Sequence, residues 1–322
     1  MAREFDLIRR HFVRPVSHTV LGPGDDCALI QPSPGKMLAV STDMLVEGTH
    51  FFPNVSPRDL GWKTLAVNVS DLAAMGAEPR WATLAGSLPT VDEDWLAAFC
   101  AGFFAAAERF GVDLIGGDTT QGPLNLCVTV LGEVSPGAAL CRSAGQAGDD
   151  VWISGRPGLA ALGLRHLKGE THLPTPWDRL CVAALQVPQP RVALGQALVG
   201  LAHAAIDVSD GLMADLGHIA KASGLCANLV LNQLPHLPEG VARDLALECL
   251  LSGGDDYELC FTAPVSARLK LAEQAAILSL PLWRIGELVL PENPDVPGCV
   301  SLIGPEGERL DWEASKGYEH FA

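Results

Sequence analysis

The stretch "MLAVSTD" at residues 37–43, followed by "SPRDLGWKTLAVNVSDLAAM" at residues 56–75, indicates the fold of this chain. The first segment is a β-branched and apolar run that ends in Asp43, which is typical of a strand. The second segment opens with a serine and a proline, a helix start signal, and predicts a helix over residues 57–75. A strand followed by a helix favours an α/β protein.

The alternation of strands and helices continues on both sides of this stretch. The first half predicts strands at residues 26–31, 37–43, 80–88, 112–116 and 124–134, with helices at 57–75 and 92–110. The second half predicts strands at 150–155, 203–207, 226–231, 256–262, 283–289 and 299–303, with helices at 190–201, 211–223, 239–250 and 266–279. Between the halves, residues 135–149 are rich in Gly, Ala and Ser and are typical of a domain junction. We therefore expect an α/β (α+β) protein of two domains, residues 1–137 and 148–322.

The composition excludes several classes of protein. With 322 residues, 48% of them hydrophobic and 19% charged, the chain has enough apolar material for a core and is not disordered. Its net charge of −16 comes without a cluster of Lys and Arg, so we expect no nucleic-acid partner. The excess carboxylate either forms a solvated surface or gathers in one place to bind cations.

Targeting and cysteine signals point to the cytoplasm. The N-terminal "MAREFDLIRRHF" is charged and amphipathic, so we expect no signal peptide. The longest apolar stretch, residues 96–107, is about half the length of a membrane-spanning helix, so we expect no membrane partner. The nine cysteines include no C-x-x-C pair and predict buried free thiols in a reducing cytoplasm rather than a zinc site.

Aspartates recur beside Gly turns and at the ends of predicted strands. Asp26, Asp43, Asp118, Asp207, Asp210 and Asp255 occupy such positions. Ligands of open α/β structures gather beyond strand ends, so these side chains can converge on one site. Each of them also has a simpler interpretation, because Asp is common in turns and at helix N-caps. Asp210 in particular could simply cap the helix that begins at Gly211.

Asp71 is harder to explain as a turn or cap residue. It lies inside the apolar helix "WKTLAVNVSDLAAMGA", with Asn68 one turn earlier on the same face. A charge in such a place costs several kcal/mol unless it is paired, and few Lys or Arg lie near these motifs. Divalent cations would pair the carboxylates, and oxygen-only ligands favour Mg²⁺ or Mn²⁺ over zinc.

Asp-bound Mg²⁺ ions would turn this acidic cluster into a polyphosphate site. The Gly-rich turns "GPG", "IGGDTT" and "LSGG" let backbone N–H groups approach phosphate oxygens. The chain has no G-x-x-x-x-G-K-[ST] loop, no H-R-D or D-F-G set and no G-x-S-x-G elbow. Phosphoryl transfer needs mainly positioning and charge neutralisation, which fits a chain rich in Asp and poor in obvious bases.

Together these stretches resemble the thiamine-monophosphate kinase family, part of the ATP-binding superfamily that includes aminoimidazole ribonucleotide synthetase. The matching segments are "GPGDDCAL", "VSTDMLVEGTHF", "KTLAVNVSDLAAMGAEP", "LIGGDTTQGPL", "AAIDVSDGLMADLGHI", "LSGGDDYELCF" and "KGYEHF". They cover nearly the whole chain in the family's order, and "VSTDxLVEGxHF" with "NxSDLAAMGAxP" is a specific pair. The resemblance implies a transferase of thiamine biosynthesis that moves the γ-phosphoryl group of ATP, the co-substrate, directly to thiamine monophosphate, giving thiamine diphosphate.

The resemblance also implies a fold, an assembly and a set of site residues. The fold is similar to aminoimidazole ribonucleotide synthetase, with an N-terminal ATP/Mg-binding domain whose sheet pairs with that of a second subunit in a homodimer, and with a C-terminal α/β domain. ATP and several Mg²⁺ ions lie between the domains. The implied metal ligands are Asp26, Ser41, Thr42, Asp43, Asp71, Asp118, Asp207 and Asp210. The implied nucleotide contacts are Gly117, Asp118, Arg142 and Ser209, and the implied substrate contacts are His50, Asp255 and Tyr318. We expect Asp43, Asp71 and Asp210 to matter most for catalysis, as metal anchors, and no single catalytic base.

Two departures from the family pattern concern the substrate contacts. The family commonly carries Gly-Gly-Glu-Asp-Tyr-Glu where this chain has Asp255, and its C-terminal "DWKGYDHF" is three residues longer here. His50 is either a substrate contact or a packed loop histidine, and Tyr318 either stacks on the thiamine ring or anchors the C-terminus. Two other functions stay open: a sibling ATP-dependent synthetase or kinase of the superfamily, and a non-catalytic nucleotide- and Mg²⁺-binding protein.

Overall fold

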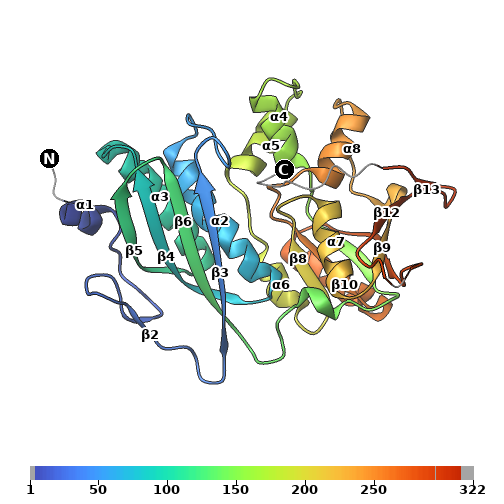
Figure 1. Cartoon of the computed structure of the whole chain (residues 1–322), viewed down its shortest axis with the longest axis horizontal. Coiled ribbons are helices and arrows are strands. Elements are labelled where there is room, and N and C mark those ends of the chain that lie inside the picture. The colour runs from blue at the N-terminus through green and yellow to red at the C-terminus, as the bar shows by residue number, and fades with distance from the viewer. Residues whose placement is uncertain (1–3, 294, 313–322) are drawn as a thin grey trace. The chain divides into compact units, whose positions relative to one another are not determined.

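The structure is a computed structural model in which residues 4–293 and 295–312 are described (Figure 1). The chain divides into two compact units. Unit 1 comprises Met1–Leu72 and Ala77–Gly137, and unit 2 comprises Ala73–Gly76 and Ala138–Ala322. The chain thus passes from one unit to the other at Gly137, and a four-residue segment at the end of one helix also groups with unit 2.

Unit 1 is built on a four-stranded sheet with the strand order β3–β6–β4–β5. The strands are β3 (Met37–Val46), β6 (Asn125–Val134), β4 (Glu78–Leu88) and β5 (Asp113–Gln121). β3 and β4 each pair with β6 in antiparallel fashion, and β4 pairs with β5 in parallel. The helices α2 (Pro57–Ala74) and α3 (Glu93–Phe110) lie on one face of this sheet (Figure 1). The predicted helices of the first half are therefore confirmed.

The other face of this sheet presents apolar side chains to solvent. Along β6, Leu126, Val128 and Val130 are buried, whereas the residues between them are partly exposed. Along β3, Val40 and Met44 are 60% and 50% exposed although both are large apolar side chains. Because side chains alternate between the two faces of a strand, one face packs on the helices, and no described element of unit 1 covers the other.

Two glycines allow α2 and α3 to pack with their backbones close together. A Cβ added to Gly102 would lie 1.8 Å from the carbonyl oxygen of Arg58. A Cβ added to Gly61 would lie 2.0 Å from the carbonyl oxygen of Phe99. No side chain fits at either position without moving a helix. This contact fixes α2, which carries Asn68 and Asp71, against the rest of unit 1.

A buried carboxylate of β5 fastens the N-terminal segment to the sheet. This segment contains α1 (Glu4–His11) and the short hairpin of β1 (Thr19–Leu21) and β2 (Leu29–Ile30). Asp113 accepts hydrogen bonds from the backbone N–H groups of Ser17 and His18 and from the hydroxyl of Thr19, at 2.6 to 2.9 Å. The carboxylate thus accepts hydrogen bonds from backbone N–H groups that have no carbonyl partner in a strand or helix.

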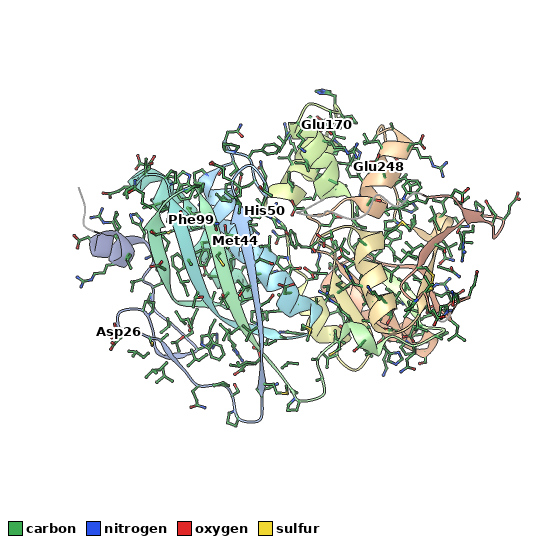
Figure 2. All side chains as sticks on the ribbon, viewed as in Figure 1. Asp26, Met44, His50, Phe99, Glu170 and Glu248 are labelled. Atoms are coloured by element: carbon green, nitrogen blue, oxygen red, sulfur yellow. A yellow bond between two sulfur atoms is a disulfide. The ribbon has the colours of Figure 1, made fainter. Side chains whose placement is uncertain are left out.

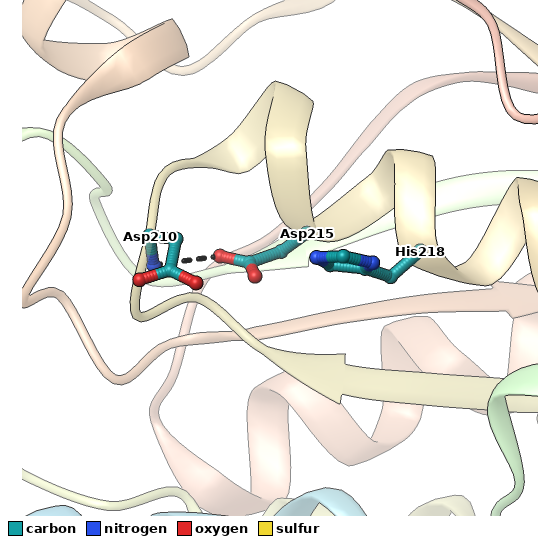
Figure 3. Close-up of side chains that lie close together, drawn as sticks. All are labelled: Asp210, Asp215 and His218. Carbon is teal, nitrogen blue, oxygen red and sulfur yellow. Dashed lines mark hydrogen bonds between the residues drawn. The ribbon is translucent and has the colours of Figure 1, made fainter. Parts of the chain in front are cut away.

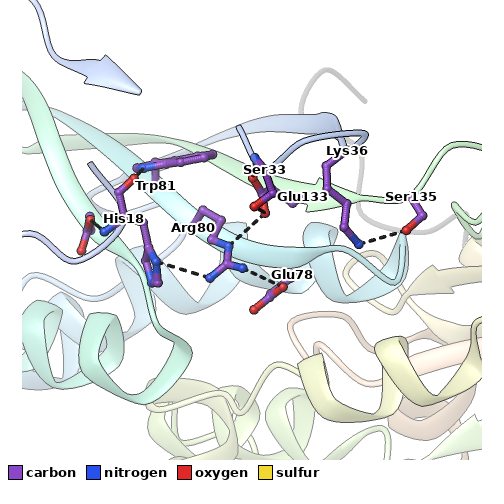
Figure 4. Close-up of polar contacts among 9 residues, drawn as sticks. His18, Ser33, Lys36, Glu78, Arg80, Trp81, Glu133 and Ser135 are labelled. Atoms are coloured by element: carbon purple, nitrogen blue, oxygen red, sulfur yellow. Dashed lines mark hydrogen bonds and ion pairs between the residues drawn. The ribbon is translucent and has the colours of Figure 1, made fainter. Parts of the chain in front are cut away.

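A second buried carboxylate, Glu133 of β6, holds the segment that follows the hairpin (Figure 4). It accepts hydrogen bonds from the N–H and the hydroxyl of Ser33 at 2.6 and 2.8 Å, and Nε of Arg80 lies 3.3 Å away. Burial alone would raise the pKa of Glu133, but the Ser33 hydrogen bonds and the charge of Arg80 lower the pKa overall. Glu133 is therefore a charged anchor at neutral pH.

Unit 2 contains a seven-stranded sheet with the order β13–β12–β9–β11–β7–β10–β8. The strands are β7 (Asp150–Ser154), β8 (Ala204–Asp207), β9 (Cys226–Val230), β10 (Leu259–Ala263), β11 (Leu282–Val289), β12 (Val300–Ile303) and β13 (Arg309–Leu310). The helices are α4 (Leu159–Leu167), α5 (Trp177–Gln186), α6 (Val192–Leu198), α7 (Leu212–Ala222), α8 (Arg243–Ser252) and α9 (Arg268–Leu278), and three short 3₁₀ helices are η1 (Arg142–Ala144), η2 (Leu231–Gln233) and η3 (Val265–Ala267). The sheet pairs its strands in antiparallel fashion except for β9 with β12.

Both faces of this sheet are buried against helices. On β7, Val151 and Ile153 belong to one apolar core together with Leu216 of α7. The residue between them, Trp152, belongs to a second core that includes Leu198 of α6. Successive residues of one strand therefore pack into two different cores. Because both faces of the sheet are buried, the strands of unit 2 have nearly continuous apolar sequences.

Several predicted boundaries are wrong. The strand predicted at residues 256–262 begins at Leu259, because Tyr257 has a φ of 52° and cannot be part of an extended strand. The strand predicted at 26–31 is reduced to the two residues of β2. The helices predicted at 190–201 and 239–250 are α6 and α8, with different ends, and α1, α5 and β1 were not predicted.

The expectation that all nine cysteines are free thiols is also wrong. Cys226 and Cys299 form a disulfide, although 73 residues separate them in the sequence. They meet because β9 and β12 lie side by side, with the N–H of Ala227 bonded to the carbonyl of Cys299. The sequence carries no signal for this pairing, since each cysteine stands alone in its own segment.

Candidate active site

In unit 1, β3 and α2 bring together three of the predicted metal ligands. The hydroxyl of Ser41 donates to a carboxylate oxygen of Asp71 at 2.5 Å. One residue pair along, the backbone N–H of Asp43 donates to the side-chain oxygen of the buried Asn68 at 2.8 Å. Ser41 and Asp43 share one face of β3, and Asn68 and Asp71 share one face of α2. The predicted pairing of Asn68 with Asp71 on one helical face is confirmed.

The side chain of Thr42 points to the opposite face of β3. Its hydroxyl lies 2.8 Å from that of Thr129, the cross-strand partner of Thr42 on β6. The structure therefore does not bring this hydroxyl to Asp71. Thr42 could therefore contribute to a site near Asp71 only through its backbone atoms.

Two aspartates expected at strand ends lie inside strands instead. β3 continues for three residues beyond Asp43 to Val46, and β5 continues beyond Asp118 to Gln121. Asp118 is exposed and lies opposite Ala85 in the register of β4 and β5. Their side chains are therefore set by the pleat of the sheet and not by turns.

Gly117, the residue before Asp118, lies where β5 closely approaches β4. A Cβ at Gly117 would lie 1.8 Å from the carbonyl oxygen of Leu84 on β4. A side chain at this position would therefore separate β4 from β5. The glycine gives Asp118 a fixed backbone next to an uncovered peptide, which suits contact with a ligand.

His50 closes the turn that follows β3. Its ring Nδ1 accepts a hydrogen bond from the N–H of Val46 at 3.0 Å, and its own N–H donates to the carbonyl of Val46 at 2.9 Å. Because Nδ1 is an acceptor, the neutral ring carries its proton on Nε2. The ring is half-buried, and its bond to Val46 fits the interpretation of His50 as a packed loop histidine.

Asp26 lies apart from the other predicted ligands of unit 1. It is exposed on the loop between β1 and β2, and its N–H donates to the carboxylate of Asp25 at 2.9 Å. Figure 2 shows Asp26 at the other end of unit 1 from Met44 and His50. The described structure therefore does not join Asp26 to the cluster formed by Ser41 and Asp71.

In unit 2, Asp207 ends β8 as predicted, and Asp210 lies three residues farther on. The interpretation of Asp210 as a helix cap is wrong. The N-cap of α7 is Gly211 and no side chain caps the helix there. The N–H of Asp210 instead donates to a carboxylate oxygen of Asp215 at 3.0 Å (Figure 3). The carboxylate of Asp210 is therefore not used as an N-cap.

The sequence analysis missed Asp215, which is 2% exposed on α7. Burial raises the pKa of Asp215 to about 7, against the effect of its backbone hydrogen bonds. Ligand atoms of Asp210, Asp215 and the exposed His218 lie within 4.8 Å of one another (Figure 3). The spacing of Asp215 from Asp210 within "SDGLMADL" was the only signal in the sequence.

The segment with Asp255 packs directly against the segment with Asp210. The N–H of Asp255 donates to the carbonyl of Ser209 at 2.9 Å, and the N–H of Tyr257 donates to the carbonyl of Val208 at 2.9 Å. A Cβ at Gly254 would lie 2.2 Å from the carbonyl oxygen of Ser209. Within unit 2, the predicted metal residue and the predicted substrate residue therefore stand on two loops that are bonded to each other.

Asp255 has an unusual conformation that its neighbour supports. Asp255 has a φ of 67° and Tyr257 a φ of 52°, both in the left-handed region that non-Gly residues rarely adopt. The hydroxyl of Tyr257 donates to the carboxylate of Asp255 at 2.9 Å. Strain of this kind persists where surrounding contacts enforce it, and it clusters at functional sites.

Two more carboxylates of the same motif have structural partners. Asp256 accepts the N–H groups of Gly158 and Ala160 at 2.6 and 3.3 Å, at the start of α4. Its pKa is raised, first by burial and then by the charges of Glu258 and Asp255. Glu258 accepts a bidentate pair of hydrogen bonds from Arg191 at 2.6 and 2.5 Å. Asp256 therefore anchors the start of α4, and Glu258 pairs with the guanidinium of Arg191.

Two predicted site residues, Arg142 and Tyr318, have not yet been placed. Arg142 is exposed on η1, where its carbonyl accepts a hydrogen bond from the hydroxyl of Ser223 at 2.9 Å. Tyr318 lies outside the described residues.

The donor set fits hard divalent cations. The cluster around Asp71 supplies carboxylate and hydroxyl oxygens, the ligands that Mg²⁺ prefers, and the group around Asp210 supplies two carboxylates and the imidazole of His218. Only one group of three or more His, Cys, Asp or Glu ligands was found among the described residues, and it includes no cysteine.

Comparisons with known proteins agree over the full length of the chain. Residues 24–134 match the family model described as AIR synthase related protein, N-terminal domain. The thiamine-monophosphate kinase of Escherichia coli (strain K12) is 45% identical over 326 residues, which cover 99% of this chain and 98% of that protein.

Solved structures give the same answer for the fold. The thiamine-monophosphate kinase of Stenotrophomonas maltophilia K279a has a TM-score of 0.84 and 47% identity, covering 95% of this chain and 96% of that one. A structure described as AaThiL complexed with AMPPCP and TMP has a TM-score of 0.76 and 28% identity, covering 98% and 96% of the two chains. The chain therefore has the fold similar to aminoimidazole ribonucleotide synthetase that its motifs implied.

Proposed function

The chain belongs to the thiamine-monophosphate kinase family, and we propose that the carboxylates of its two units bind the Mg²⁺ ions that this reaction uses. The protein is a kinase that phosphorylates thiamine monophosphate with ATP and yields thiamine diphosphate. The observation that carries this conclusion is the 45% identity over 99% of the chain. One relative's structure is described as a complex with AMPPCP and TMP, which supports ATP and thiamine monophosphate as the two substrates.

The chemistry of the acceptor explains why the proposal includes no catalytic base. The acceptor is a phosphate monoester whose second pKa is about 6, so at pH 7 it is mostly a dianion and already nucleophilic. The transfer then depends on holding two anions in line. Ser41, Asp43 and Asp71 in unit 1 and Asp207 and Asp210 in unit 2 would serve this purpose as metal anchors.

Bound Mg²⁺ ions neutralise the negative charge of the phosphates that must approach each other. We assign the ions to oxygen ligands from Asp26, Ser41, Thr42, Asp43, Asp71, Asp118, Asp207 and Asp210. Thr42 would contribute its backbone, since its hydroxyl is engaged with that of Thr129 on the other face of β3. Asp26 stands on an exposed loop, so its participation requires that the loop be brought to the other ligands.

We assign the nucleotide to Gly117, Asp118, Arg142 and Ser209, and the acceptor to His50, Asp255 and Tyr318. The close approach at Gly117 supports the first assignment, because it exposes a backbone beside a carboxylate. The Nε2–H of His50 can donate to a phosphate oxygen, since its Nδ1 is held by Val46. The first unit would act as the ATP/Mg-binding and dimerisation domain, residues 1–137, and the second as the C-terminal domain, residues 148–322.

A homodimer would cover the open face of the sheet in unit 1. Leu38, Val40 and Met44 alternate along β3 and are 37%, 60% and 50% exposed, so they form an apolar stripe on one face of the strand. Pairing with the same face of a second copy would bury them. We place this assembly in the cytoplasm. None of the helices in the described ranges is both long and apolar enough to cross a membrane.

The function is tested by incubating the purified protein with ATP, Mg²⁺ and thiamine monophosphate and following thiamine diphosphate by chromatography. Mg²⁺-dependent product is expected, and parallel reactions omit Mg²⁺ or replace the acceptor with free thiamine. Binding of ATP without any turnover would favour the non-catalytic alternative. Turnover only with a different phosphorylated acceptor would favour a sibling enzyme of the superfamily.

A further inference from the structure

The backbone of residues 209–211 converges on a single oxygen of Asp215, and Figure 3 shows the hydrogen bond from Asp210. The N–H groups of Ser209, Asp210 and Gly211 all donate to Oδ2 of Asp215, at 3.0, 3.0 and 3.1 Å. The N–H of Asp215 returns a hydrogen bond to the carbonyl of Gly211 at 2.9 Å. A buried side chain thus organises the three residues at whose centre Asp210 lies.

The same loop is held from its other side by the 255–258 segment. The carbonyl groups of Val208 and Ser209 accept the N–H groups of Tyr257 and Asp255, each at 2.9 Å. The N–H of Val208 donates to the carbonyl of Glu258 at 2.8 Å. The 255–258 segment therefore bonds the backbone of Val208 and Ser209, and Asp215 bonds the N–H groups of Ser209, Asp210 and Gly211.

The carboxylate of Asp215 differs from an ordinary helix N-cap in the N–H groups that it accepts. An N-cap side chain bonds N–H groups inside the helix, but α7 has Gly211 at that position and no side-chain cap. Asp215 reaches back from inside the helix to donors that lie before it. Three N–H dipoles aimed at one oxygen favour an ionised acceptor over a neutral one.

We propose that Asp215 is a positioning residue that holds the 209–211 backbone and thereby fixes the carboxylate of Asp210 for a divalent cation. This inference rests on the proposed metal role of Asp210. The proposed role of Asp215 is carried by its Oδ2, which accepts all three of these N–H groups. Groups that orient metal ligands in this way commonly change metal affinity or activity by about 10- to 100-fold when they are replaced.

Two variants of the full chain separate the charge of Asp215 from its hydrogen bonds. Asp215→Asn keeps an oxygen of the same reach and removes the charge, whereas Asp215→Ser removes most of the reach as well. The Mg²⁺ concentration that half-saturates binding of a non-hydrolysable ATP analogue is measured by calorimetry. We expect it to rise about tenfold in Asp215→Asn and further, toward about 100-fold, in Asp215→Ser. The KM for thiamine monophosphate should stay within about twofold while kcat falls.

Amide hydrogen exchange of the metal-free variants gives a second readout that does not depend on activity. Exchange at residues 209–211 should accelerate in Asp215→Ser, while exchange in the strands of unit 2 stays as in the unmodified protein. Asp244→Asn is the matched control, since Asp244 is an exposed aspartate in the first turn of α8. It should leave both the Mg²⁺ dependence and the exchange unchanged.

Two further variants distinguish the ways in which the proposal can fail. If Asp210→Asn weakens Mg²⁺ dependence and Asp215→Asn and Asp215→Ser do not, Asp215 has no positioning role and the metal role of Asp210 stands. If Asp210→Asn also has no effect, the metal assignment itself is wrong. If His218→Ala raises the Mg²⁺ requirement as much as Asp215→Asn does, Asp215 is a direct ligand in a shared site and the proposal is overturned. If neither Asp215 variant folds, Asp215 is a folding residue and the positioning role is likewise overturned.

Discussion

The hydroxyl of Ser41 donates to the carboxylate of Asp71 across 2.5 Å, and this hydrogen bond joins strand β3 to helix α2.

Asp71→Asn should lower turnover at limiting Mg²⁺ by at least about tenfold, because an amide is a poorer metal ligand than a carboxylate. Initial rates of thiamine diphosphate formation over a range of Mg²⁺ concentrations measure this effect. Asp94→Asn, on an exposed first turn of α3, is the control. Near-normal turnover of Asp71→Asn at limiting Mg²⁺ would remove Asp71 from the metal anchors.

Tyr257→Phe should raise the KM for thiamine monophosphate about tenfold and leave the KM for ATP nearly unchanged. The Tyr257 hydroxyl donates to the Asp255 carboxylate at 2.9 Å, and a hydrogen bond to a charged group is worth about 1.5 kcal/mol, which corresponds to about tenfold in affinity. Asp255→Ala should raise the same KM, and the double variant should add little to either change. Equal increases in both KM values would mean that Tyr257 supports the fold of the loop and not the acceptor contact.

Val40→Asp should convert the protein to a monomer at micromolar concentration. Val40 is 60% exposed on the uncovered face of unit 1, and a charge there would have to be buried in the proposed dimer. Light scattering of the variant and of the unmodified protein gives the two masses. Val265→Asp makes the same change at an apolar side chain of unit 2 that is 53% exposed, and it should not alter the mass. A monomeric unmodified protein would contradict the proposed dimer directly.

Glu133→Gln should destabilise the protein by about 1–3 kcal/mol at pH 7, because the Ser33 and Arg80 donors lose a charged acceptor. The pKa of Glu133 is lowered in the folded state, so its contribution is present above the ordinary Glu pKa of about 4.3 and is lost as the pH falls through the lower folded value. The difference between variant and unmodified protein should therefore shrink on acidification. Urea unfolding at several pH values tests this, with the exposed Glu108→Gln as control. A difference that grows at low pH would show that Glu133 is not held as an anion.

Reduction of the Cys226–Cys299 disulfide should lower the free energy of unfolding by up to about 4 kcal/mol. The crosslink spans 73 residues, and the chain-entropy model gives a stabilisation of this size for such a loop. Unfolding curves with and without a thiol reductant should differ for the unmodified protein and coincide for a Cys226→Ala/Cys299→Ala variant. Cys141→Ala, at an exposed free cysteine, should keep the dependence on reductant. Curves that do not respond to reductant would show that the bond does not stabilise the protein.

Much of the local structure follows from short stretches of sequence. Helix α3 was predicted at 92–110 and runs over Glu93–Phe110, because Asp92 caps its first turn and Gly111 ends it in the left-handed conformation. The position of Asp71 within an apolar helix correctly indicated a polar cluster with Asn68 on the same face. Caps and helical periodicity depend on residues a few positions apart, so they can be recognised directly in the sequence.

Other features depend on partners that are distant in the sequence. Asp43 and Asp118 lie inside strands, because pairing with β6 and with β4 extends β3 and β5 beyond the ends that composition suggested. Tyr257 takes a positive φ where a strand was expected, because its N–H is bonded to the carbonyl of Val208 on another loop. No short-range pattern reports such contacts.

Short segments of the chain were enough to predict the α/β class, the helices of unit 1 and, through the motifs, the family. The disulfide between Cys226 and Cys299, the orientation of Thr42 away from Asp71 and the hydrogen bond from Asp210 to Asp215 became visible only in the folded protein. The two sets of features differ in the range of the interactions that produce them. Caps and periodicity act between neighbours in the chain, whereas the orientation of a ligand is set by hydrogen bonds that exist only after distant segments have packed together.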